Sequence, residues 1–263
     1  MPTLKVNNLN MYYEQTGKGP DVVFISGLSA DHTMWDLTYF KDSFRVLTFD
    51  NRGAGQTDVP EVAYGMDAFI EDTVALCQEL GIKKAHFVGH SMGGHIVQYL
   101  AANYRELVNK AVIACSEQVF STISYLATNM QVALRQYNIP KKLLIENYLP
   151  VLFSMSYLKE QKNRDNFVQS VLNNPYPQTN KGYIGQVEAI RNHDTTHLLA
   201  KIKSPSLVIG CEEDLLTPYE NSIFLANHIP HARLATIKNC GHAPFIENPN
   251  EFFKLIASFL SEE

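Results

Sequence analysis

Short apolar segments alternate along the chain with longer segments in which apolar residues recur at helical spacing. The apolar segments cover residues 22–25, 46–49, 85–88, 111–114 and 206–209, and a weaker one covers 232–237. They are apolar at nearly every position, whereas a strand with one wet face is apolar at every second position. This pattern predicts strands of a parallel sheet that is covered on both faces.

Helical spacing marks three further segments, at residues 68–80, 95–103 and 252–260. The first of them ends before Gly81, and glycine is a typical residue just after a helix C-terminus. Strands that alternate with helices in this way predict an α/β fold, doubly wound, with right-handed crossovers between parallel strands.

One long segment, residues 117–199, lacks a convincing strand. It is rich in Leu, Tyr, Phe and Met, and four prolines interrupt it, at positions 140, 150, 175 and 177. We interpret it as a helical cap inserted after the strand at 111–114, over the carboxyl ends of the strands, where α/β sheets bind ligands. Residues 1–116 and 200–263 then form the core domain. The alternative is that these helices belong to the ordinary core.

Composition narrows the class of protein. Of 263 residues, 45% are hydrophobic and 19% are charged, the net charge is −5, and Lys and Arg are scattered, which argues against a nucleic-acid partner. No segment approaches the roughly 18 apolar residues of a membrane span, and the first residues lack a signal-peptide pattern, so we expect a cytoplasmic protein. The cysteines, without CxxC spacing, are expected to be buried free thiols; they are Cys77, Cys115, Cys211 and Cys240.

The segment Gly89-His90-Ser91-Met92-Gly93 connects a predicted strand to a predicted helix. A Gly-x-Ser-x-Gly sequence in this context is typical of a sharp turn that exposes a nucleophilic serine, because only small residues fit where strand and helix nearly touch. Ser91 is therefore the candidate nucleophile. The alternative is a glycine-rich packing turn whose serine caps the helix. We expect the side chain of His90 to point away from Ser91.

A serine nucleophile needs a base, and the base needs an acid that holds its tautomer. His242 lies on a loop between the last predicted strand and the last helix, from which it could reach Ser91. Asp214 follows the buried strand at 206–209 and is our choice of acid. The alternative acids are Glu212, Glu213 and Glu117.

These motifs together resemble the α/β-hydrolase fold family over nearly the whole chain. The order Ser91, Asp214, His242 is the order of nucleophile, acid and base in that family. The resemblance implies a mostly parallel eight-stranded sheet with a helical cap, and no metal or organic cofactor. The further matching segments are Phe24-Ile25-Ser26-Gly27-Leu28 with Trp35, Phe49-Asp50-Asn51-Arg52-Gly53-Ala54-Gly55, Pro218 and Gly241-His242-Ala243-Pro244.

The resemblance also implies an oxyanion hole formed by the backbone N–H groups of Leu28 and Met92. Gly27, Leu28 and Met92 are accordingly the expected substrate-binding residues of the core. Ser26 stands where most members carry histidine, and Cys211 stands where a glycine is common. The turn that contains Asp50 and Arg52 is expected to brace the loop beneath the site.

The implied reaction is acyl transfer from a small carboxylic ester, lactone or thioester to Ser91, and then to water. Two alternatives stay open: a carbon–carbon bond hydrolase of the same fold, and a small-ligand receptor with little turnover. The sequence is compatible with a monomer or a homodimer. Aromatic residues and methionines of the predicted cap indicate an apolar pocket, although each of them could instead pack inside the cap. These residues are Tyr125, Met130, Tyr137, Tyr148, Phe153, Met155 and Tyr157.

Overall fold

The computed structural model describes residues 2–262, which contain one eight-stranded sheet with the strand order β1-β2-β4-β3-β5-β6-β7-β8. β2 is antiparallel to its neighbours β1 and β4, and every other neighbouring pair is parallel. The predicted mostly parallel α/β sheet is therefore confirmed. The strands are β1 (Thr3–Val6), β2 (Leu9–Gly17), β3 (Asp21–Ile25), β4 (Arg45–Phe49), β5 (Ala85–His90), β6 (Val108–Ala114), β7 (Ser206–Cys211) and β8 (Ala232–Ile237).

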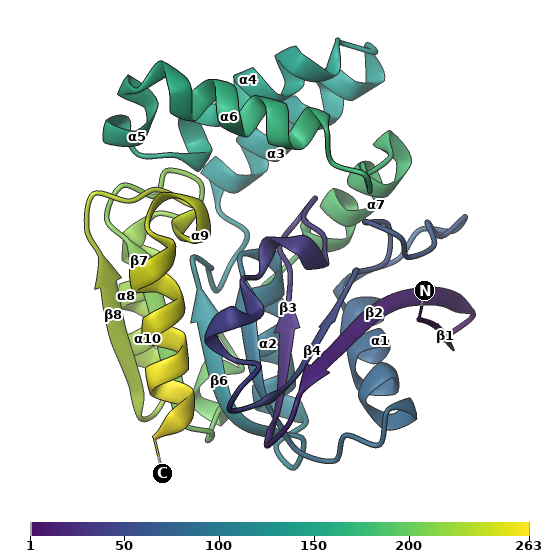
Figure 1. The fold of residues 1–263 in the computed structure, drawn as a ribbon, viewed down its shortest axis with the longest axis vertical. Coiled ribbons are helices and arrows are strands. Elements are labelled where there is room, and N and C mark those ends of the chain that lie inside the picture. The colour runs from purple at the N-terminus through teal and green to yellow at the C-terminus, as the bar shows by residue number, and fades with distance from the viewer. Residues whose placement is uncertain (1, 263) are drawn as a thin grey trace.

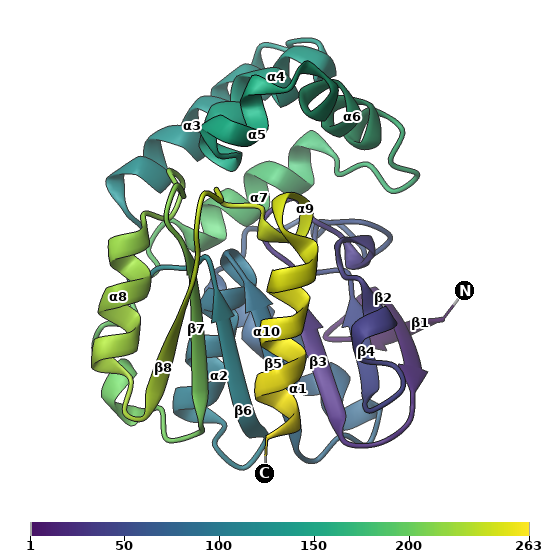
Figure 2. The ribbon, with the colours of Figure 1, turned by 60° about the vertical axis from the view of Figure 1, so that its left-hand side comes forward.

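Helices cover both faces of this sheet (Figures 1 and 2). One face packs against α1 (Met66–Glu79), α2 (Met92–Asn103) and α8 (Tyr219–His228). The other packs against α10 (Pro249–Ser261) and the short helices η1 (His32–Met34) and η2 (Leu37–Tyr39). Two short helices complete the core, η3 (Leu199–Lys201) before β7 and α9 (Pro244–Glu247) before α10.

Each central strand supplies side chains to both cores, which explains its continuous apolar sequence. In β3, Val23 and Ile25 enter the core beneath α1 and α2, whereas Val22 and Phe24 enter the core beneath α10. All four side chains are fully buried. Because successive side chains of a strand point to opposite faces, both sets of positions must be apolar when both faces are covered.

Five α-helices, α3 to α7, lie between β6 and η3 and form a cap above the sheet, as Figure 2 shows most clearly. An isolated bridge between Val119 and Asp194 joins the two ends of the inserted segment. The predicted helical cap after the sixth strand is confirmed, while a domain division at residues 117 and 199 stays a prediction. The cap helices are α3 (Thr122–Gln136), α4 (Lys141–Leu152), α5 (Met155–Lys159), α6 (Gln161–Leu172) and α7 (Asn180–Ile190).

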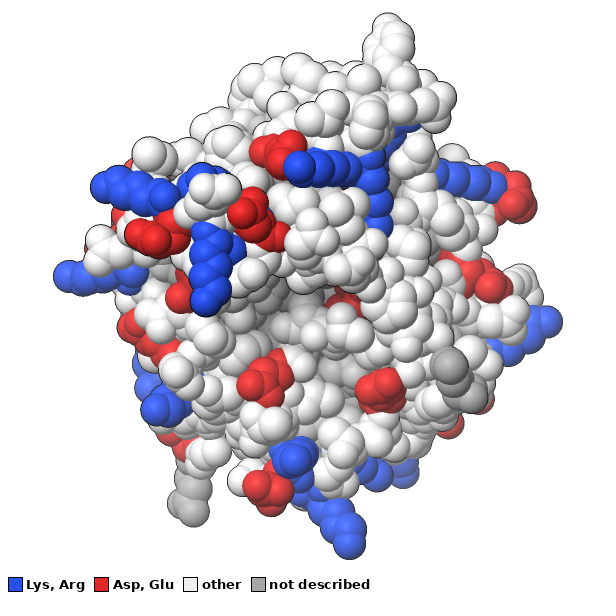
Figure 3. Space-filling model, turned by 45° about the horizontal axis from the view of Figure 1, so that its top comes forward, with Lys and Arg blue, Asp and Glu red and all other residues white. Residues whose placement is uncertain are grey.

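The distribution of charged side chains and the state of the cysteines match the expectations drawn from the composition. Lys and Arg are interspersed with Asp and Glu over the face shown in Figure 3, so that face has no large patch of one sign. No helix within residues 2–262 is long and apolar enough to cross a membrane. All four cysteines are free and buried, as predicted.

Candidate active site

Ser91 occupies a strained turn between β5 and α2. Its backbone torsions are φ 55° and ψ −119°, which an L-residue rarely adopts. A Cβ atom on Gly89 would lie 2.2 Å from the carbonyl oxygen of Gly93, and one on Gly93 would lie 2.0 Å from that of Ile25. Both glycines are therefore required for the close approach of strand and helix that sequence analysis predicted.

His242 and Asp214 form a buried hydrogen-bonded pair. The distance from His242 Nδ1 to Asp214 Oδ2 is 2.8 Å, and each residue is only 3% exposed. Asp214 Oδ1 also accepts hydrogen bonds of 2.9 Å from the backbone N–H groups of Leu216 and Thr217, and Oδ2 accepts one of 2.8 Å from Thr217 Oγ1. This set of bonds fixes the carboxylate, which in turn places the proton of a neutral His242 on Nδ1 and leaves Nε2 free to act as a base.

The alternative acids do not bond to His242. Glu212 is exposed, and Glu213 accepts a hydrogen bond of 3.0 Å from the backbone N–H of Met155. Glu117 is fully buried, but neither of its carboxyl oxygens makes a hydrogen bond within residues 2–262. The structure therefore brings Asp214, among the four candidates, to the histidine.

Ser91 and His242 line the same cavity, which has a volume of about 500 Å³ between the core and the cap. No hydrogen bond joins Ser91 Oγ to His242 in the part of the chain that the structure describes. A nucleophile and its base are often more loosely placed without substrate. The cavity thus contains a half-buried serine on a strained turn and a histidine with a free ring nitrogen.

Leu28 and Met92, the two residues expected to form an oxyanion hole, also line this cavity. Within residues 2–262, neither of their backbone N–H groups donates a hydrogen bond. Met92 is the first residue of α2, where a backbone N–H has no partner inside the helix. A Cβ atom on Gly27 would lie 3.2 Å from the Cβ of Ser91, so the Gly27–Leu28 loop passes directly beside the serine.

The comparison with known families agrees with this geometry. The sequence model described as the alpha/beta hydrolase fold matches residues 20–249. The chain belongs to the alpha/beta hydrolase fold family.

Members of the family that resemble this chain include hydrolases of known name. A 3-oxoadipate enol-lactonase from Acinetobacter baylyi is 26% identical over 254 residues, which cover 95% of this chain and 92% of that protein. The structure of an enol-lactonase from Burkholderia xenovorans LB400 has a TM-score of 0.90 at 26% identity, and the match covers 99% of this chain and 100% of the enol-lactonase chain. The structure of an esterase from Thermogutta terrifontis has a TM-score of 0.85 at 25% identity, and the match covers 98% of this chain and 97% of that one.

In this member of the family, Ser26 has a definite structural role at the position where histidine is common. Its Oγ accepts a hydrogen bond of 3.0 Å from Trp35 Nε1 and donates one of 3.1 Å to the carbonyl oxygen of Asp31. Asn51 Nδ2 donates a hydrogen bond of 2.9 Å to the Ser26 carbonyl oxygen. These bonds fix the start of the Gly27–Leu28 loop, so the serine replaces the histidine without leaving the loop unsupported.

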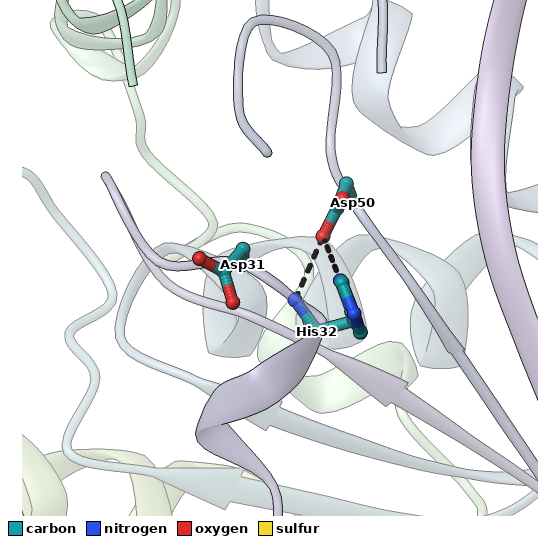
Figure 4. Close-up of side chains that lie close together, drawn as sticks. All are labelled: Asp31, His32 and Asp50. Atoms are coloured by element: carbon teal, nitrogen blue, oxygen red, sulfur yellow. Dashed lines mark hydrogen bonds and ion pairs between the residues drawn. The ribbon is translucent and has the colours of Figure 1, made fainter. Parts of the chain in front are cut away.

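Asp31, His32 and Asp50 form a second polar cluster beneath this loop (Figure 4). Asp50 Oδ1 accepts hydrogen bonds from the backbone N–H of His32 at 2.7 Å and from its Nδ1 at 2.9 Å. Burial lowers the pKa of His32, but the hydrogen bond and charge of Asp50 outweigh it and raise that pKa above its usual value. The carboxylate oxygens of Asp31 accept hydrogen bonds from Thr33 and Asn174. These hydrogen bonds within the protein agree with the expected role of the Asp50 turn in supporting the loop.

His90 contacts the catalytic candidates in a way that its place in the sequence did not reveal. Its Nε2 lies 2.8 Å from the backbone carbonyl oxygen of His242, and because a carbonyl only accepts, Nε2 carries the proton. Burial and, to a lesser extent, the nearby His242 together lower the pKa of His90 to about 3. The neutral ring of His90 therefore supports the His242 loop, a role that the sequence did not indicate.

Glu117 is a second residue of the cavity wall whose role the sequence did not resolve. Burial raises the pKa of its carboxyl group to about 7, although the nearby hydroxyl groups of Ser124 and Ser121 act in the opposite direction. The backbone carbonyl of Glu117 accepts hydrogen bonds from Gln98 Nε2 at 3.1 Å and from His193 Nε2 at 3.1 Å. The side chain is consequently held at the cavity without a hydrogen-bond partner of its own.

The cap aromatics and methionines suggested by the sequence fall into three groups. Tyr148 alone among them lines the cavity. Phe153 and Tyr157 pack inside the cap, with their ring centroids 4.5 Å apart. The remaining four are exposed: Tyr125, Met130, Tyr137 and Met155. Tyr148, Tyr183 and Arg135 are among the polar residues of a cavity wall whose accessible surface is mostly apolar.

Proposed function

We propose that this alpha/beta hydrolase cleaves a small carboxylic ester, lactone or thioester through an acyl-enzyme on Ser91. The observation that carries the proposal is the buried His242–Asp214 pair, which lies on the same cavity as the strained turn of Ser91. A histidine held in one tautomer by a carboxylate, close to a serine on such a turn, is the arrangement that activates a hydroxyl group for nucleophilic attack.

The reaction follows from the position of each group. His242 Nε2 removes the proton from Ser91 Oγ as this oxygen attacks the carbonyl carbon of the substrate. The negative charge that develops on the carbonyl oxygen is stabilised by the N–H groups of Leu28 and Met92 and by the N-terminus of α2. His242 then returns the proton to the leaving oxygen or sulfur atom. Water repeats these steps and releases the acid.

The names of related proteins support a carboxylic ester as the bond that is cleaved. Both an enol-lactonase and an esterase are named among the structures that cover nearly the whole chain, and both names describe cleavage of a carboxylic ester bond. For this chain, the acyl and leaving groups depend on the wall that residues 117–199 contribute. We propose that this segment is a cap that selects the substrate, because Leu144, Ile145 and Phe167 line the cavity from it.

The proposal is tested with a fluorophosphonate probe, which labels activated serines, and with a panel of esters, thioesters and lactones. We expect a single labelled site at Ser91, found by mass spectrometry of the digested protein, and loss of both labelling and turnover in S91A. Heat-denatured protein is the control for non-specific labelling. If wild type and S91A are equally inactive on acetyl to octanoyl esters and neither is labelled, the protein is a ligand-binding member of the fold.

A further inference from the structure

A cationic side chain projects from the cap into the cavity without an acidic partner. Arg135, near the end of α3, lines the cavity. Its Nη1 donates hydrogen bonds to the Oε1 of Gln131 at 2.6 Å and to the carbonyl oxygen of the same residue at 3.2 Å. Its Nε and Nη2 groups make no hydrogen bond or ion pair with any residue in the range 2–262. One edge of the guanidinium group is therefore free.

Two tyrosines, Tyr148 and Tyr183, line the same cavity as this cation, and Tyr183 packs against it. The guanidinium carbon of Arg135 lies 3.7 Å from the ring centroid of Tyr183, whose side chain is almost completely buried. Both tyrosines are among the residues that line the cavity, and their hydroxyl groups are buried and make no hydrogen bond in the described part of the chain. Burial raises the pKa of both tyrosines, so each keeps its proton and can donate it.

A group of buried hydrogen-bond donors destabilises the folded protein unless an acceptor is available to it. A buried polar group without a hydrogen bond, and a desolvated charge without a counter-charge, each cost free energy. The carboxylates elsewhere on the cavity wall do not supply the acceptor. Asp31 already accepts hydrogen bonds from Thr33 and Asn174, and Glu117 makes no ion pair with Arg135. A molecule in the cavity that carries a hydrogen-bond acceptor would satisfy these donors.

We propose that Arg135, Tyr148 and Tyr183 form a subsite for a carboxylate group carried by the substrate, an inference that rests on the proposed function of Ser91. The free Nε–Nη2 edge of an arginine matches the two oxygens of a carboxylate, and hydroxyl groups can complete its shell. The substrate class is then an ester or lactone with a second, ionised acid group. Apolar residues such as Leu28, Leu144 and Ile190 also line the cavity and can contact the carbon chain of such a substrate.

The first test compares anionic and neutral esters of matched size. One pair, p-nitrophenyl glutarate and p-nitrophenyl pentanoate, places the carboxylate on the acyl side. A second pair, 4-acetoxybenzoate and 4-methylphenyl acetate, places it on the leaving group. We expect wild type to favour the anionic member of one pair. In R135Q, the ratio of the two kcat/KM values should fall by about 10- to 100-fold, the range of a charged hydrogen-bonded pair.

Arg191 provides the matched control. It is another arginine of the cap that lies over a tyrosine ring, that of Tyr125, but it pairs with Glu188 at 2.9 Å and does not line the cavity. R191Q should keep the wild-type ratio. Y148F and Y183F each remove only a hydroxyl group, so they test the same subsite if R135Q does not fold. Each should lower the ratio in the same direction. An equal effect of R135Q and both tyrosine variants on anionic and neutral esters would overturn the subsite.

A binding measurement separates failure of this subsite from failure of the proposed reaction. Calorimetry with S91A, which cannot form the acyl-enzyme, should show tighter binding of monomethyl glutarate than of methyl pentanoate, and R135Q in that background should remove the difference. If wild type hydrolyses no ester but this difference is present, the reaction is wrong and the subsite stands. If esters are hydrolysed but monomethyl glutarate binds no better than methyl pentanoate, the subsite is wrong.

Discussion

The imidazole of His90 donates a hydrogen bond of 2.8 Å to the backbone carbonyl of His242, across 152 positions of sequence. The two rings also lie against each other, with centroids 4.9 Å apart. His90 is the covalent neighbour of Ser91, so this bond connects the turn of the candidate nucleophile to the loop of the candidate base. The relative position of Ser91 and His242 therefore depends on a residue that takes no part in proton transfer.

We expect His90→Phe to lower kcat by about 10- to 100-fold, because a displacement of catalytic groups by about 1 Å has an effect of this size. The phenyl ring keeps most of the volume but leaves the His242 carbonyl without its donor. Steady-state kinetics on the best ester of the panel measures the effect. His86→Phe is the control, since His86 is a buried histidine of the same strand that lies outside the cavity. A kcat for His90→Phe within twofold of wild type would contradict the positioning role.

The hydrogen bonds of Asp214 predict a large effect of removing its charge. Asp214→Asn should lower kcat on the order of ten-thousandfold while the protein stays folded, because the amide favours the wrong tautomer of His242. The comparison is Glu117→Gln, which changes a buried carboxyl of the same cavity that does not bond to His242. Circular dichroism verifies the fold of both variants. If Glu117→Gln has the larger effect on kcat, Glu117 is the acid.

Local patterns made the central sheet and the serine turn predictable. The strand β3 is apolar at its four buried positions, residues 22–25, because both its faces are covered there, and this property can be read from four adjacent residues. Gly89 and Gly93 are likewise required by contacts within the turn itself and with the adjacent strand. Asp214 and His242 could be selected because each lies in the loop that follows a predicted strand, and the carboxyl ends of parallel strands meet at one edge of the sheet.

The features that were not predicted depend on contacts between distant segments. β1 and β2 lie at the edge of the sheet, and β2 is half exposed with a mixed polar sequence, so no apolar run marks it. In the cap, Tyr148 faces the cavity while Tyr125 and Tyr137 face solvent, and the packing of α3 against α4 and α7 decides this. The partner of His90 lies on a loop near the other end of the chain.

Two glycines allow the cost of a close contact to be separated from the cost of a strained backbone. Gly93→Ala should lower the free energy of unfolding by about 3 kcal/mol, because its new Cβ would lie 2.0 Å from the carbonyl oxygen of Ile25. Gly81, at the end of α1, has φ 70° and no atom within 4 Å of a new Cβ. Gly81→Ala should therefore cost only about 1 kcal/mol. Urea unfolding measures both values, and equal losses would show that the predicted contact is relieved at little cost.

The raised pKa of Glu117 predicts a characteristic pH dependence of stability. The carboxyl group has a pKa of about 7 in the folded protein and an ordinary value of 4.5. Between these values the folded state keeps a proton that the unfolded state has lost, so the stability of wild type falls as the pH rises through this window. Glu117→Gln stays neutral at every pH. Relative to wild type, it should therefore gain about 3 kcal/mol in unfolding free energy between pH 4 and pH 8.

Urea unfolding at a series of pH values gives the difference between Glu117→Gln and wild type directly. Glu79→Gln, at an exposed position of α1, is the control for the removal of one carboxyl group and should leave the pH dependence of wild type unchanged. A difference for Glu117→Gln that does not vary between pH 4 and pH 8 would mean that the Glu117 carboxyl group titrates normally. In that case the cavity would supply water or another partner to its oxygens, and the charge facing Ser91 and His242 would be negative throughout the neutral range.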